Sequence, residues 1–424
     1  MRVVIIGNGV AGFTAALGIR KRRPDAHITM ISGESREPIS RPALMYLYMG
    51  HMRHKDIQPY PSDLWQRERI SLAHGWVTHI DVNARAVQMK DGTHLSYDRL
   101  LLATGSRTNQ FGWPGQDLEH CHGMVSLQDL AALEAVSPRL KRGVIVGGGL
   151  IGVELAEMLR SRGIETTVLV REGGFWGNVL PTEEANMVDE VVRNNGVDLR
   201  LCTELAEIHD DGQGRVGAAT TSTGDRIACE FVGLTAGVRP NLSAVAGSTI
   251  PTHRGILVNE FMETSISGVF AAGDCAEIQP DGAETYLQQV WYTGRAQGEV
   301  AAANICGDPQ PYQPGIWFNS AKFFDLEFQV YGIVPPTPAD DVHQLFWKAD
   351  DASACIRLVQ RHGALVGIQS MGTRLRHRVC EQWIETQATV TEVIEKLSQA
   401  AFDPEFARNH CAAARTHFRR QAAP

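Results

Sequence analysis

Short apolar runs alternate with helical patterns along most of the chain. Residues 2–6 (RVVII) and 143–146 (GVIV) are mostly apolar, as expected of strands buried on both faces of a parallel sheet. Each run is followed by a glycine-rich turn and then by Ala- and Leu-rich spacing typical of a helix. Another strand is predicted at Ala26–Ile31, after a helix that ends before Pro24. The pattern predicts two similar α/β units.

The two glycine-rich turns have the same spacing, GNGVAG at residues 7–12 and GGGLIG at residues 147–152. In such a turn the first glycine allows a tight bend, the second lets the backbone approach a pyrophosphate, and the third lets the helix pack on the sheet. The diphosphate would then lie on N–H groups at the positive end of the helix. One turn alone also arises wherever a strand meets a helix tightly, but two copies in the same context predict two bound nucleotides.

Glu34 and the turn Thr104–Gly105 are further binding candidates in the first unit. Glu34 follows the second strand, where such folds accept hydrogen bonds from adenosine ribose hydroxyls, although a lone glutamate is also common in a solvated loop. Residues 97–107 read as a buried strand that closes on the Thr-Gly turn, which would bring backbone against a ligand.

Two later segments end in similar glycine turns. Residues 233–241 close the second unit, and residues 264–274 form an apolar strand that ends in Gly-Asp. Asp274 could bind hydroxyl groups, cap the helix expected over about residues 288–305, or do both.

The last part of the chain, from about Tyr312 to Pro424, is predicted to be a smaller α+β domain in which two or three helices follow the strands. Its strand-like stretches are Lys322–Val334, Val342–Trp347, Ala354–Arg361 and Leu365–Met371. The tail from Arg408 to Arg420 is rich in Arg and His. It could receive an acidic redox protein, or it could be the solvated end of a helix.

Length and charge bound the class of protein. A chain of 424 residues allows two or three domains, and its net charge of -8, from 40 basic and 48 acidic side chains, does not suggest nucleic acid or an anionic membrane as partner. We expect small molecules or another protein instead. Strand-forming residues begin at Arg2, which leaves no room for a cleavable signal, and no apolar stretch approaches the roughly 20 residues that span a bilayer. A cytoplasmic protein is expected.

The eight cysteines have no C-x-x-C or C-x-x-x-x-C spacing, which argues against a disulfide scaffold, a zinc ribbon and an internal redox dithiol. The run His120-Cys121-His122 lacks a second ligand cluster, so we interpret it as a partly exposed loop and expect no metal site.

Together, these motifs resemble the pyridine nucleotide-disulfide oxidoreductase flavoproteins over about residues 1–310. The resemblance is carried, in this order, by GNGVAG, Glu34, YDRLLLATGSR, GGGLIGVELAE, AGVRPN and T-x-x-x-x-V-F-A-A-G-D. The segment Ser40–Leu44 looks most like the ferredoxin-reductase and NADH-oxidase-like branches. The resemblance implies an α/β fold with two Rossmann-like domains. These would be an FAD-binding domain of residues 1–111 and 242–311, an NAD(P)H-binding domain of residues 112–241, and a C-terminal α+β domain of residues 312–424.

The resemblance also implies roles for single residues. Glu34 would bind the adenosine ribose, Arg41 the FAD phosphates and Asp274 the ribityl chain, while Arg171 would contact the nicotinamide coenzyme. The other cofactor-binding candidates are Gly7, Gly9, Val10, Ala11, Gly12, Pro42, Ala103, Thr104, Gly105, Arg107, Gly147, Gly149, Gly152, Gly237, Gly273 and Tyr292.

The three catalytic candidates are Glu154, Tyr46 and Trp291. Glu154 is expected where the helix of the second unit meets the flavin. Trp291 and Tyr292 would be the first residues of a helix that points at the flavin ring, although plain core packing explains an aromatic pair equally well.

The chain departs from the family pattern in two informative places. No cysteine occurs in Ser40–Gly50, the region from which disulfide reductases supply a redox sulfur. Tyr46 stands where ferredoxin reductases commonly have a lysine that pairs with the equivalent of Glu154. If Glu154 is buried without another partner, its pKa should rise.

The coenzyme can be argued from the strand Thr167–Val170. NADH-selecting units end this strand with an acidic residue, but here Val170 stands at that point and Arg171 follows it. An arginine can pair with a 2'-phosphate, which favours NADPH over NADH, although Glu172 would oppose this pairing.

The expected chemistry is hydride transfer from NAD(P)H to FAD and electron delivery to an external acceptor. Our first hypothesis is a reductase of a small redox protein such as a ferredoxin or rubredoxin. The second is an oxidase or a reductase of a quinone or small disulfide, with the last domain as a homodimer interface. The third is a flavin-bound redox sensor or interaction protein.

Overall fold

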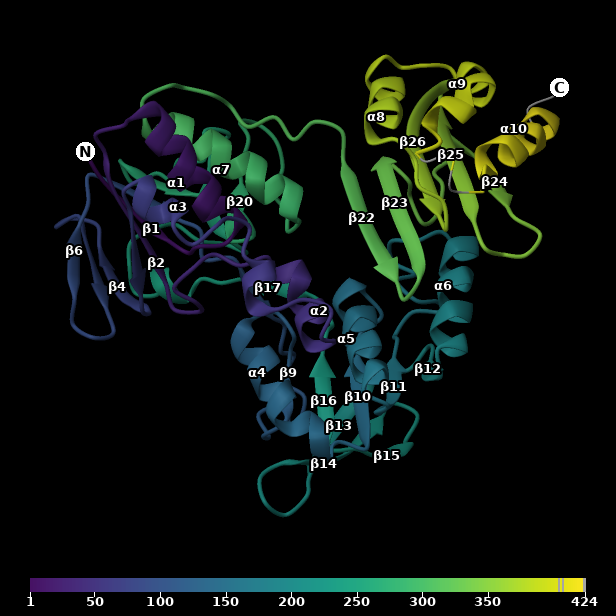
Figure 1. Cartoon of the computed structure of the whole chain (residues 1–424), viewed down its shortest axis with the longest axis horizontal. Helices are drawn as coiled ribbons and strands as arrows, with labels where there is room; N and C mark the ends of the chain where they lie inside the picture. The colour runs from purple at the N-terminus through teal and green to yellow at the C-terminus, as the bar shows by residue number, and fades with distance from the viewer. Residues whose placement is uncertain (403–404, 406–407, 422–424) are drawn as a thin grey trace. The chain divides into compact units, whose positions relative to one another are not determined.

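The computed structural model describes residues 1–402, 405 and 408–421. The chain forms two compact units, each assembled from three separate segments (Figure 1). Unit 1 consists of Met1–Gln110, His122–Pro138 and Gly237–Pro314, and unit 2 of Phe111–Cys121, Arg139–Ala236 and Gly315–Pro424. Among the described residues, no helix is long and apolar enough to cross a membrane.

Unit 1 is built on a five-stranded parallel sheet in the order β19-β7-β1-β2-β3. Its strands are β1 (Arg2–Ile6), β2 (His27–Ser32), β3 (Ile70–His74), β7 (Arg99–Leu102) and β19 (Val269–Ala271). The apolar run of β1 lies in the middle of the sheet and is buried from Val3 to Ile6, which explains its nearly continuous hydrophobic sequence. The strands expected at residues 2–6 and 26–31 are therefore present.

Smaller elements complete unit 1. Its antiparallel strands are β4 (Val77–Asp81), β5 (Ala86–Met89), β6 (His94–Ser96), β8 (Ser106–Thr108), β17 (Val238–Pro240) and β21 (Tyr286–Leu287), and β18 (Ile256–Val258) pairs in parallel with β20 (Ala276–Ile278). Its helices are α1 (Val10–Arg22), α2 (Leu44–Tyr48), α3 (Leu64–Arg67), α4 (Leu127–Val136) and α7 (Trp291–Ile305).

Helices α1 and α7 pack closely, although α1 lies near the N-terminus and α7 lies near residue 300. A Cβ added at Gly298 of α7 would lie 2.5 Å from the carbonyl oxygen of Ala11, so only glycine allows the two backbones to approach this closely. The expected helix over residues 288–305 is present but begins at Trp291.

Unit 2 contains a second five-stranded sheet in the order β12-β11-β10-β16-β9, whose four strands β12, β11, β10 and β16 are parallel. Its strands are β9 (Cys121–His122), β10 (Arg142–Val146), β11 (Glu165–Leu169), β12 (Val197–Arg200) and β16 (Phe231–Leu234). The other elements in this part are α5 (Leu150–Ser161), α6 (Thr182–Asn194), β13 (Leu205–Asp210), β14 (Val216–Thr221) and β15 (Arg226–Ala228). This repeats the strand–turn–helix order of unit 1, as the two glycine motifs predict.

The C-terminal part of unit 2 is an antiparallel sheet in the order β22-β23-β26-β25-β24. Its elements are β22 (Phe318–Phe323), β23 (Leu326–Gly332), β24 (Val342–Lys348), β25 (Cys355–Arg361), β26 (Ala364–Met371), α8 (His377–Glu385), α9 (Val390–Lys396) and α10 (His410–Gln421). The strand-like stretch Lys322–Val334 includes the end of β22 and all of β23, because the chain turns back at Phe324, whose φ is +53°. The strands form a core with the following helices, as expected of an α+β domain.

Two ion pairs join this C-terminal sheet to the parallel-sheet part of unit 2. Arg357 of β25 is buried and donates hydrogen bonds to Glu184 of α6, with Nε–Oε1 and Nη2–Oε2 distances of 2.7 Å each. Lys322 of β22 donates to Glu157 of α5 with an Nζ–Oε1 distance of 2.6 Å. Helices α5 and α6 are thereby tied to the C-terminal strands through charged groups.

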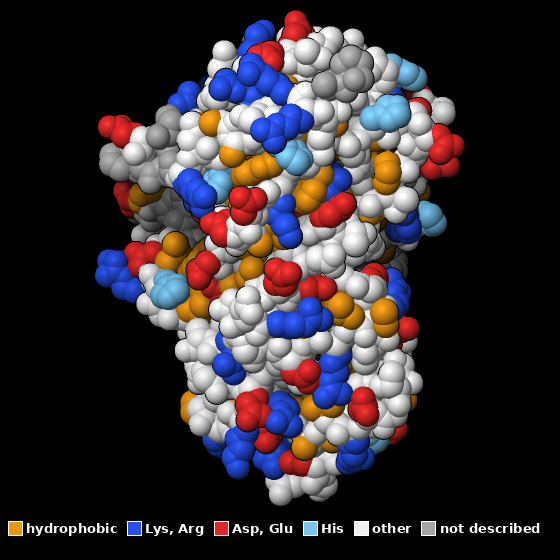
Figure 2. Space-filling view, turned by 90° about the vertical axis from the view of Figure 1, so that its right-hand side faces the viewer, with side chains coloured by type: hydrophobic (Ala, Val, Ile, Leu, Met, Phe, Trp, Pro, Cys, Tyr) orange, Lys and Arg blue, Asp and Glu red, His pale blue; other side chains and the backbone are white. Residues whose placement is uncertain are grey.

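The basic tail is balanced by acidic neighbours. Arg419 on α10 pairs with Glu395, and Arg408 pairs with Asp351. On the face drawn in Figure 2, basic and acidic side chains are interspersed rather than separated by sign. This arrangement is that of a solvated helix end.

Candidate coenzyme-binding sites

The first glycine turn has the geometry of a pyrophosphate cradle. Gly7 has a φ of +112°, and a Cβ there would lie 1.9 Å from the carbonyl oxygen of Ala103. A Cβ at Gly12 would lie 2.0 Å from the carbonyl oxygen of Gly7, whereas a Cβ at Gly9 would meet nothing within 4 Å. Protein atoms thus explain why residues 7 and 12 are glycine. Gly9 faces open space, where a ligand can approach the backbone.

The second turn repeats this pattern in unit 2. Gly147 has a φ of +118°, and a Cβ there would lie 2.7 Å from Thr235 backbone atoms. A Cβ at Gly152 would lie 2.2 Å from the carbonyl oxygen of Gly147, and Gly149 again faces open space. The two cradles are equivalent although they share no residues.

The helices that follow the cradles are suited to an anion. Gly9 and Gly149 are the N-cap residues of α1 and α5, and neither helix has a side-chain cap or an acidic residue in its first turn. Val10 and Ala11 begin α1, so their amide groups lie at the positive end of the helix dipole. Each cradle therefore fits the diphosphate of a dinucleotide.

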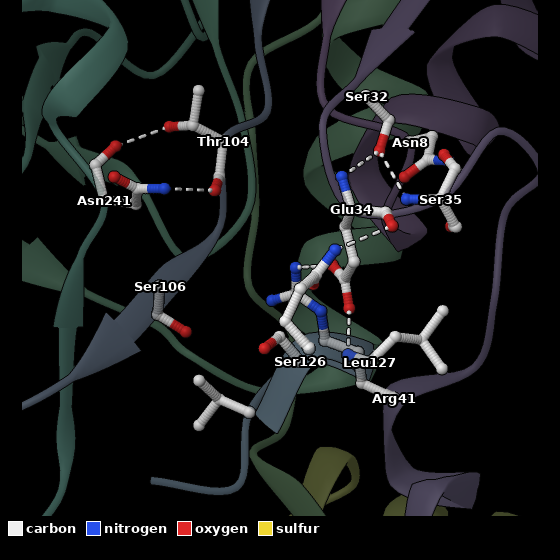
Figure 3. Close-up of polar contacts among 12 residues, drawn as sticks. Asn8, Ser32, Glu34, Ser35, Arg41, Thr104, Ser106, Ser126, Leu127 and Asn241 are labelled. Carbon is white, nitrogen blue, oxygen red and sulfur yellow. Dashed lines mark hydrogen bonds and ion pairs between the residues drawn. The ribbon is translucent and has the colours of Figure 1, made fainter. Parts of the chain in front are cut away.

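Glu34 and Arg41 lie together beside the first cradle (Figure 3). Arg41 Nη2 donates to Glu34 Oε2 at 2.6 Å, and the Leu127 amide donates to Glu34 Oε1 at 3.0 Å. Only 10% of the Glu34 side chain is exposed. The carboxylate is thus held in place at the end of β2, and Arg41, which begins a short 3₁₀ helix with Pro42 and Ala43, is its ion-pair partner.

The Thr104–Gly105 turn is fixed from two sides. The Thr104 hydroxyl donates to the carbonyl oxygen of Asn241 at 2.7 Å (Figure 3), and the backbone N–H of Asn241 donates to the carbonyl oxygen of Gly105 at 2.9 Å. Gly105 has a φ of +69°, and a Cβ there would lie 3.2 Å from Arg41 Nη1. The turn therefore lies against Arg41, close to the first cradle.

Asp274 shares this neighbourhood. Its Oδ2 accepts a hydrogen bond of 2.7 Å from the Ser106 hydroxyl. Burial raises the pKa of Asp274, while the Ser106 hydrogen bond and the charge of Arg41 oppose this rise. Gly273, which has a φ of +79°, donates to Gln297 Oε1 on α7 at 2.8 Å. Hydroxyl-binding and charged groups thus converge from β2, β7 and β19.

The remaining candidates of unit 1 lie at different places. Trp291 begins α7 and packs on Phe13, with ring centroids 6.1 Å apart, whereas Tyr292 is 47% exposed. Tyr46 lies on α2 with its ring 6.3 Å from that of His51. Arg107 and Gly237 belong to the β8–β17 region, where Gly237 accepts a hydrogen bond from the Asn109 amide and Arg107 is exposed.

In unit 2, Glu154 is surrounded by charged groups of α5 and β22. Burial, followed by the nearby Glu157 carboxylate, raises the pKa of Glu154 to about 7 against the opposing charge of Lys322. The expected increase of the Glu154 pKa is therefore confirmed. Its cationic neighbour comes from the C-terminal sheet, which sequence reasoning did not identify.

Arg171 projects from the end of β11 and is 69% exposed. It donates to Glu172 with an Nη2–Oε1 distance of 2.9 Å. Val170 is buried, and a Cβ at Gly148 would touch its side chain at 2.7 Å. Arg171, which favours binding of a 2'-phosphate, thus contacts Glu172, which opposes it.

Sequence reasoning did not identify Ser106 as a partner of Asp274 or Lys322 as a neighbour of Glu154. Ser106 lies in the motif YDRLLLATGSR and directly follows the Thr-Gly turn, so its position could have identified it as a site residue. Nothing in the local pattern around Lys322 points to α5. All eight cysteines are free thiols, and no group of three or more His, Cys, Asp or Glu in the described part of the chain could hold a metal ion.

Two cradles, each on a parallel sheet, define a protein that binds two dinucleotides. The model of the family Pyridine nucleotide-disulphide oxidoreductase matches residues 1–298, so the chain belongs to this family. It is accordingly an FAD-containing, NAD(P)H-dependent oxidoreductase, as the motifs implied.

Similar proteins extend over nearly the whole chain. Rhodocoxin reductase of Rhodococcus erythropolis is 28% identical over 410 residues, which cover 96% of this chain and 94% of that protein. The ferredoxin–NAD(+) reductase component of the p-cumate 2,3-dioxygenase system of Pseudomonas putida is 30% identical over 334 residues, or 78% of this chain and 81% of that protein. The crystal structure of a ferredoxin reductase from Rhodopseudomonas palustris has a TM-score of 0.79 and 26% identity, and the match covers 88% of this chain and 91% of that one.

Proposed function

We propose that this enzyme passes electrons from NAD(P)H through FAD to a small redox protein of the ferredoxin or rubredoxin type. The observation that carries the proposal is the pair of equivalent cradles in a chain whose Ser40–Gly50 segment has no cysteine. Without a thiol in that segment, a disulfide relay has no starting point there. Electrons must then leave from the flavin itself, and the similar proteins named as ferredoxin and rhodocoxin reductases support a protein acceptor.

We assign FAD to unit 1. The cradle of Gly7, Gly9 and Gly12 would hold its pyrophosphate, and Glu34 its ribose. Asp274 and the Thr104–Gly105 turn would bind the middle of the molecule. Arg41 pairs with Glu34 in this structure, so it is placed to exchange this partner for a phosphate when FAD is bound. Bound flavin supplies the capacity to accept hydride from a nicotinamide and to release the electrons to an acceptor.

We assign NAD(P)H to the cradle of Gly147, Gly149 and Gly152 in unit 2, with residues 312–424 as a third, C-terminal domain. Arg171 is exposed and therefore accessible to a 2'-phosphate, which supports NADPH as the preferred coenzyme. Its contact with Glu172 lowers this preference, because the carboxylate competes with the phosphate.

Anaerobic stopped-flow spectroscopy tests the proposal. The purified protein should show a flavin spectrum that NADPH bleaches rapidly, then reoxidise slowly in air and much faster when a ferredoxin or rubredoxin is added. Fast reoxidation by air alone would instead identify an oxidase. Sluggish bleaching by both coenzymes would favour a redox sensor, and failure to bind FAD would refute the assignment altogether.

Two further parts of the proposal concern the cellular setting. The free thiols are typical of a reducing compartment, so we propose that the enzyme works in the cytoplasm. We also propose a homodimer formed through the C-terminal domain, and light scattering during size-exclusion chromatography would detect a monomer if this is wrong.

A further inference from the structure

Three charged side chains meet where α5 faces strand β22 of the C-terminal sheet. Glu154 and Glu157 are three residues apart on α5, so they lie on the same side of the helix. Lys322 on β22 donates to Glu157 Oε1 at 2.6 Å. Both members of this ion pair are mostly buried, with 27% of the lysine and 16% of the glutamate side chain exposed.

The charges in this cluster do not balance. One lysine faces two carboxylates in a poorly solvated place, and the ion pair places its ammonium on Glu157. Two arginines of the neighbouring elements have partners outside this cluster. Arg142 of β10 pairs with Glu165 of β11, and Arg160 of α5 donates to the backbone carbonyl groups of Ile164 and Asn195. Burial raises the pKa of Glu154 most, Glu157 raises it and Lys322 lowers it, and together they bring this pKa to about 7, so that both neighbouring charges act on a group that titrates near neutral pH.

Glu154 lies one helical turn beyond the second cradle. Its helix α5 begins with Leu150 directly after Gly149, and one turn advances about 5.4 Å along the axis. A coenzyme whose pyrophosphate rests on the first turn therefore has Glu154 within reach of its remaining length. The oxidised nicotinamide ring carries a positive charge and the reduced ring is neutral, so a carboxylate favours the oxidised form and a carboxylic acid does not.

We propose that Lys322, by pairing with Glu157, sets the charge of Glu154 and thereby the preference of the coenzyme site for oxidised over reduced nicotinamide. The inference rests on the proposed assignment of NAD(P)H to this cradle. Lys322 is a positioning residue in this scheme, since it acts through Glu154, which exchanges its proton with solvent. A strand of the C-terminal sheet thus adjusts the electrostatics of the coenzyme site.

The test compares the affinities of FAD-loaded protein for NADP⁺ and for a tetrahydro analogue, whose ring is neutral and cannot deliver hydride. Calorimetric titrations between about pH 5.5 and 8.5 give the ratio of the two affinities. In the unaltered protein the ratio should rise with pH, by up to about tenfold per pH unit, around a midpoint near 7. Glu154→Gln should make the ratio independent of pH.

The two members of the ion pair should act in opposite directions. Lys322→Met should move the midpoint up by about one pH unit or more, because a positive charge is lost. Glu157→Gln should move it down, because a neighbouring negative charge is lost. Lys322→Arg should restore the original midpoint, and the exposed Lys348→Met of the same sheet is the matched control that should leave it unchanged. If the ion pair were merely structural, Lys322→Met and Glu157→Gln would have the same effect on the midpoint.

An unchanged midpoint in Lys322→Met, shifts of the same sign in the two variants, or a pH-dependent ratio that persists in Glu154→Gln would overturn the inference. Failure of the proposed function looks different. A protein that binds neither form of the coenzyme refutes the assignment of the cradle. A protein that binds both forms with a ratio independent of pH refutes only the role of Lys322 and Glu154.

Discussion

Replacing Gly149 with alanine should weaken coenzyme binding without harming the fold. Gly149 has a φ of -112° and a ψ of -172°, which is extended backbone that any residue adopts. A Cβ at this position meets no protein atom within 4 Å. The remaining cost is the change of N-cap from glycine to alanine, which is below about 1 kcal/mol.

The same methyl group would stand where a pyrophosphate must approach the backbone. Losing one hydrogen bond between an N–H group and a charged phosphate costs about 1.5–3 kcal/mol, which corresponds to roughly a 10- to 100-fold weaker Kd. Calorimetric titration of FAD-loaded Gly149→Ala with NADP⁺ measures this loss directly, and the flavin spectrum shows whether FAD is retained.

Three controls make the result specific. Gly9→Ala, the equivalent change in unit 1, should weaken FAD binding instead and leave the structure intact, because Gly9 also faces open space. Gly152→Ala should prevent folding of its unit, since its Cβ would lie 2.2 Å from a carbonyl oxygen. Wild-type affinity for NADP⁺ in folded Gly149→Ala would refute the second cradle, and loss of FAD in that variant would show that the two assignments are reversed.

Three further outcomes are expected. Glu184→Ala should lower the free energy of unfolding by about 3 kcal/mol, because it leaves buried Arg357 without its buried partner. The control Glu183→Ala removes a partner that is 54% exposed and should lower it by less than about 1 kcal/mol. Equal losses of the two variants in urea titrations would contradict this. Arg171→Glu should reduce kcat/KM for NADPH relative to NADH, and steady-state kinetics with an unchanged ratio would argue against 2'-phosphate recognition. Burial alone would raise the pKa of Glu277, but hydrogen bonds, first from the Thr285 hydroxyl, lower it to about 2. The ionised form of Glu277 therefore stabilises the protein above pH about 4.5, and this contribution is lost as the pH falls towards 2. The difference in melting temperature between wild type and Glu277→Gln should accordingly shrink, and not grow, as the pH falls over that range.

The parallel-sheet elements could be read from the sequence because their signals are local. The strands at residues 2–6 and 143–146 are apolar and end at glycines whose positive φ values only glycine adopts readily. The break in Lys322–Val334 could not be read in this way. The chain turns there at Phe324 and Asp325, without a glycine or proline to mark the bend.

The polar environment of the candidate site was even harder to predict from the sequence. The sequence shows that Tyr46 stands in place of a lysine, and this predicts the raised pKa of Glu154. It does not show that Lys322 lies nearby, because β22 and α5 are brought together by tertiary packing alone. Likewise, Glu34 and Arg41 were each expected to bind a cofactor, but their mutual ion pair depends on the path of the loop between them.

The interleaving of segments in the two units has a consequence for synthesis on the ribosome. The parallel sheet of unit 1 lacks β19 until residue 271 has emerged, and α1 lacks its closely packed neighbour until α7 is complete at Ile305. The first glycine cradle is therefore translated almost at once but stays unsupported until nearly three quarters of the chain exists. Nascent chains halted before that point should capture no flavin, and those halted shortly after it should begin to turn yellow.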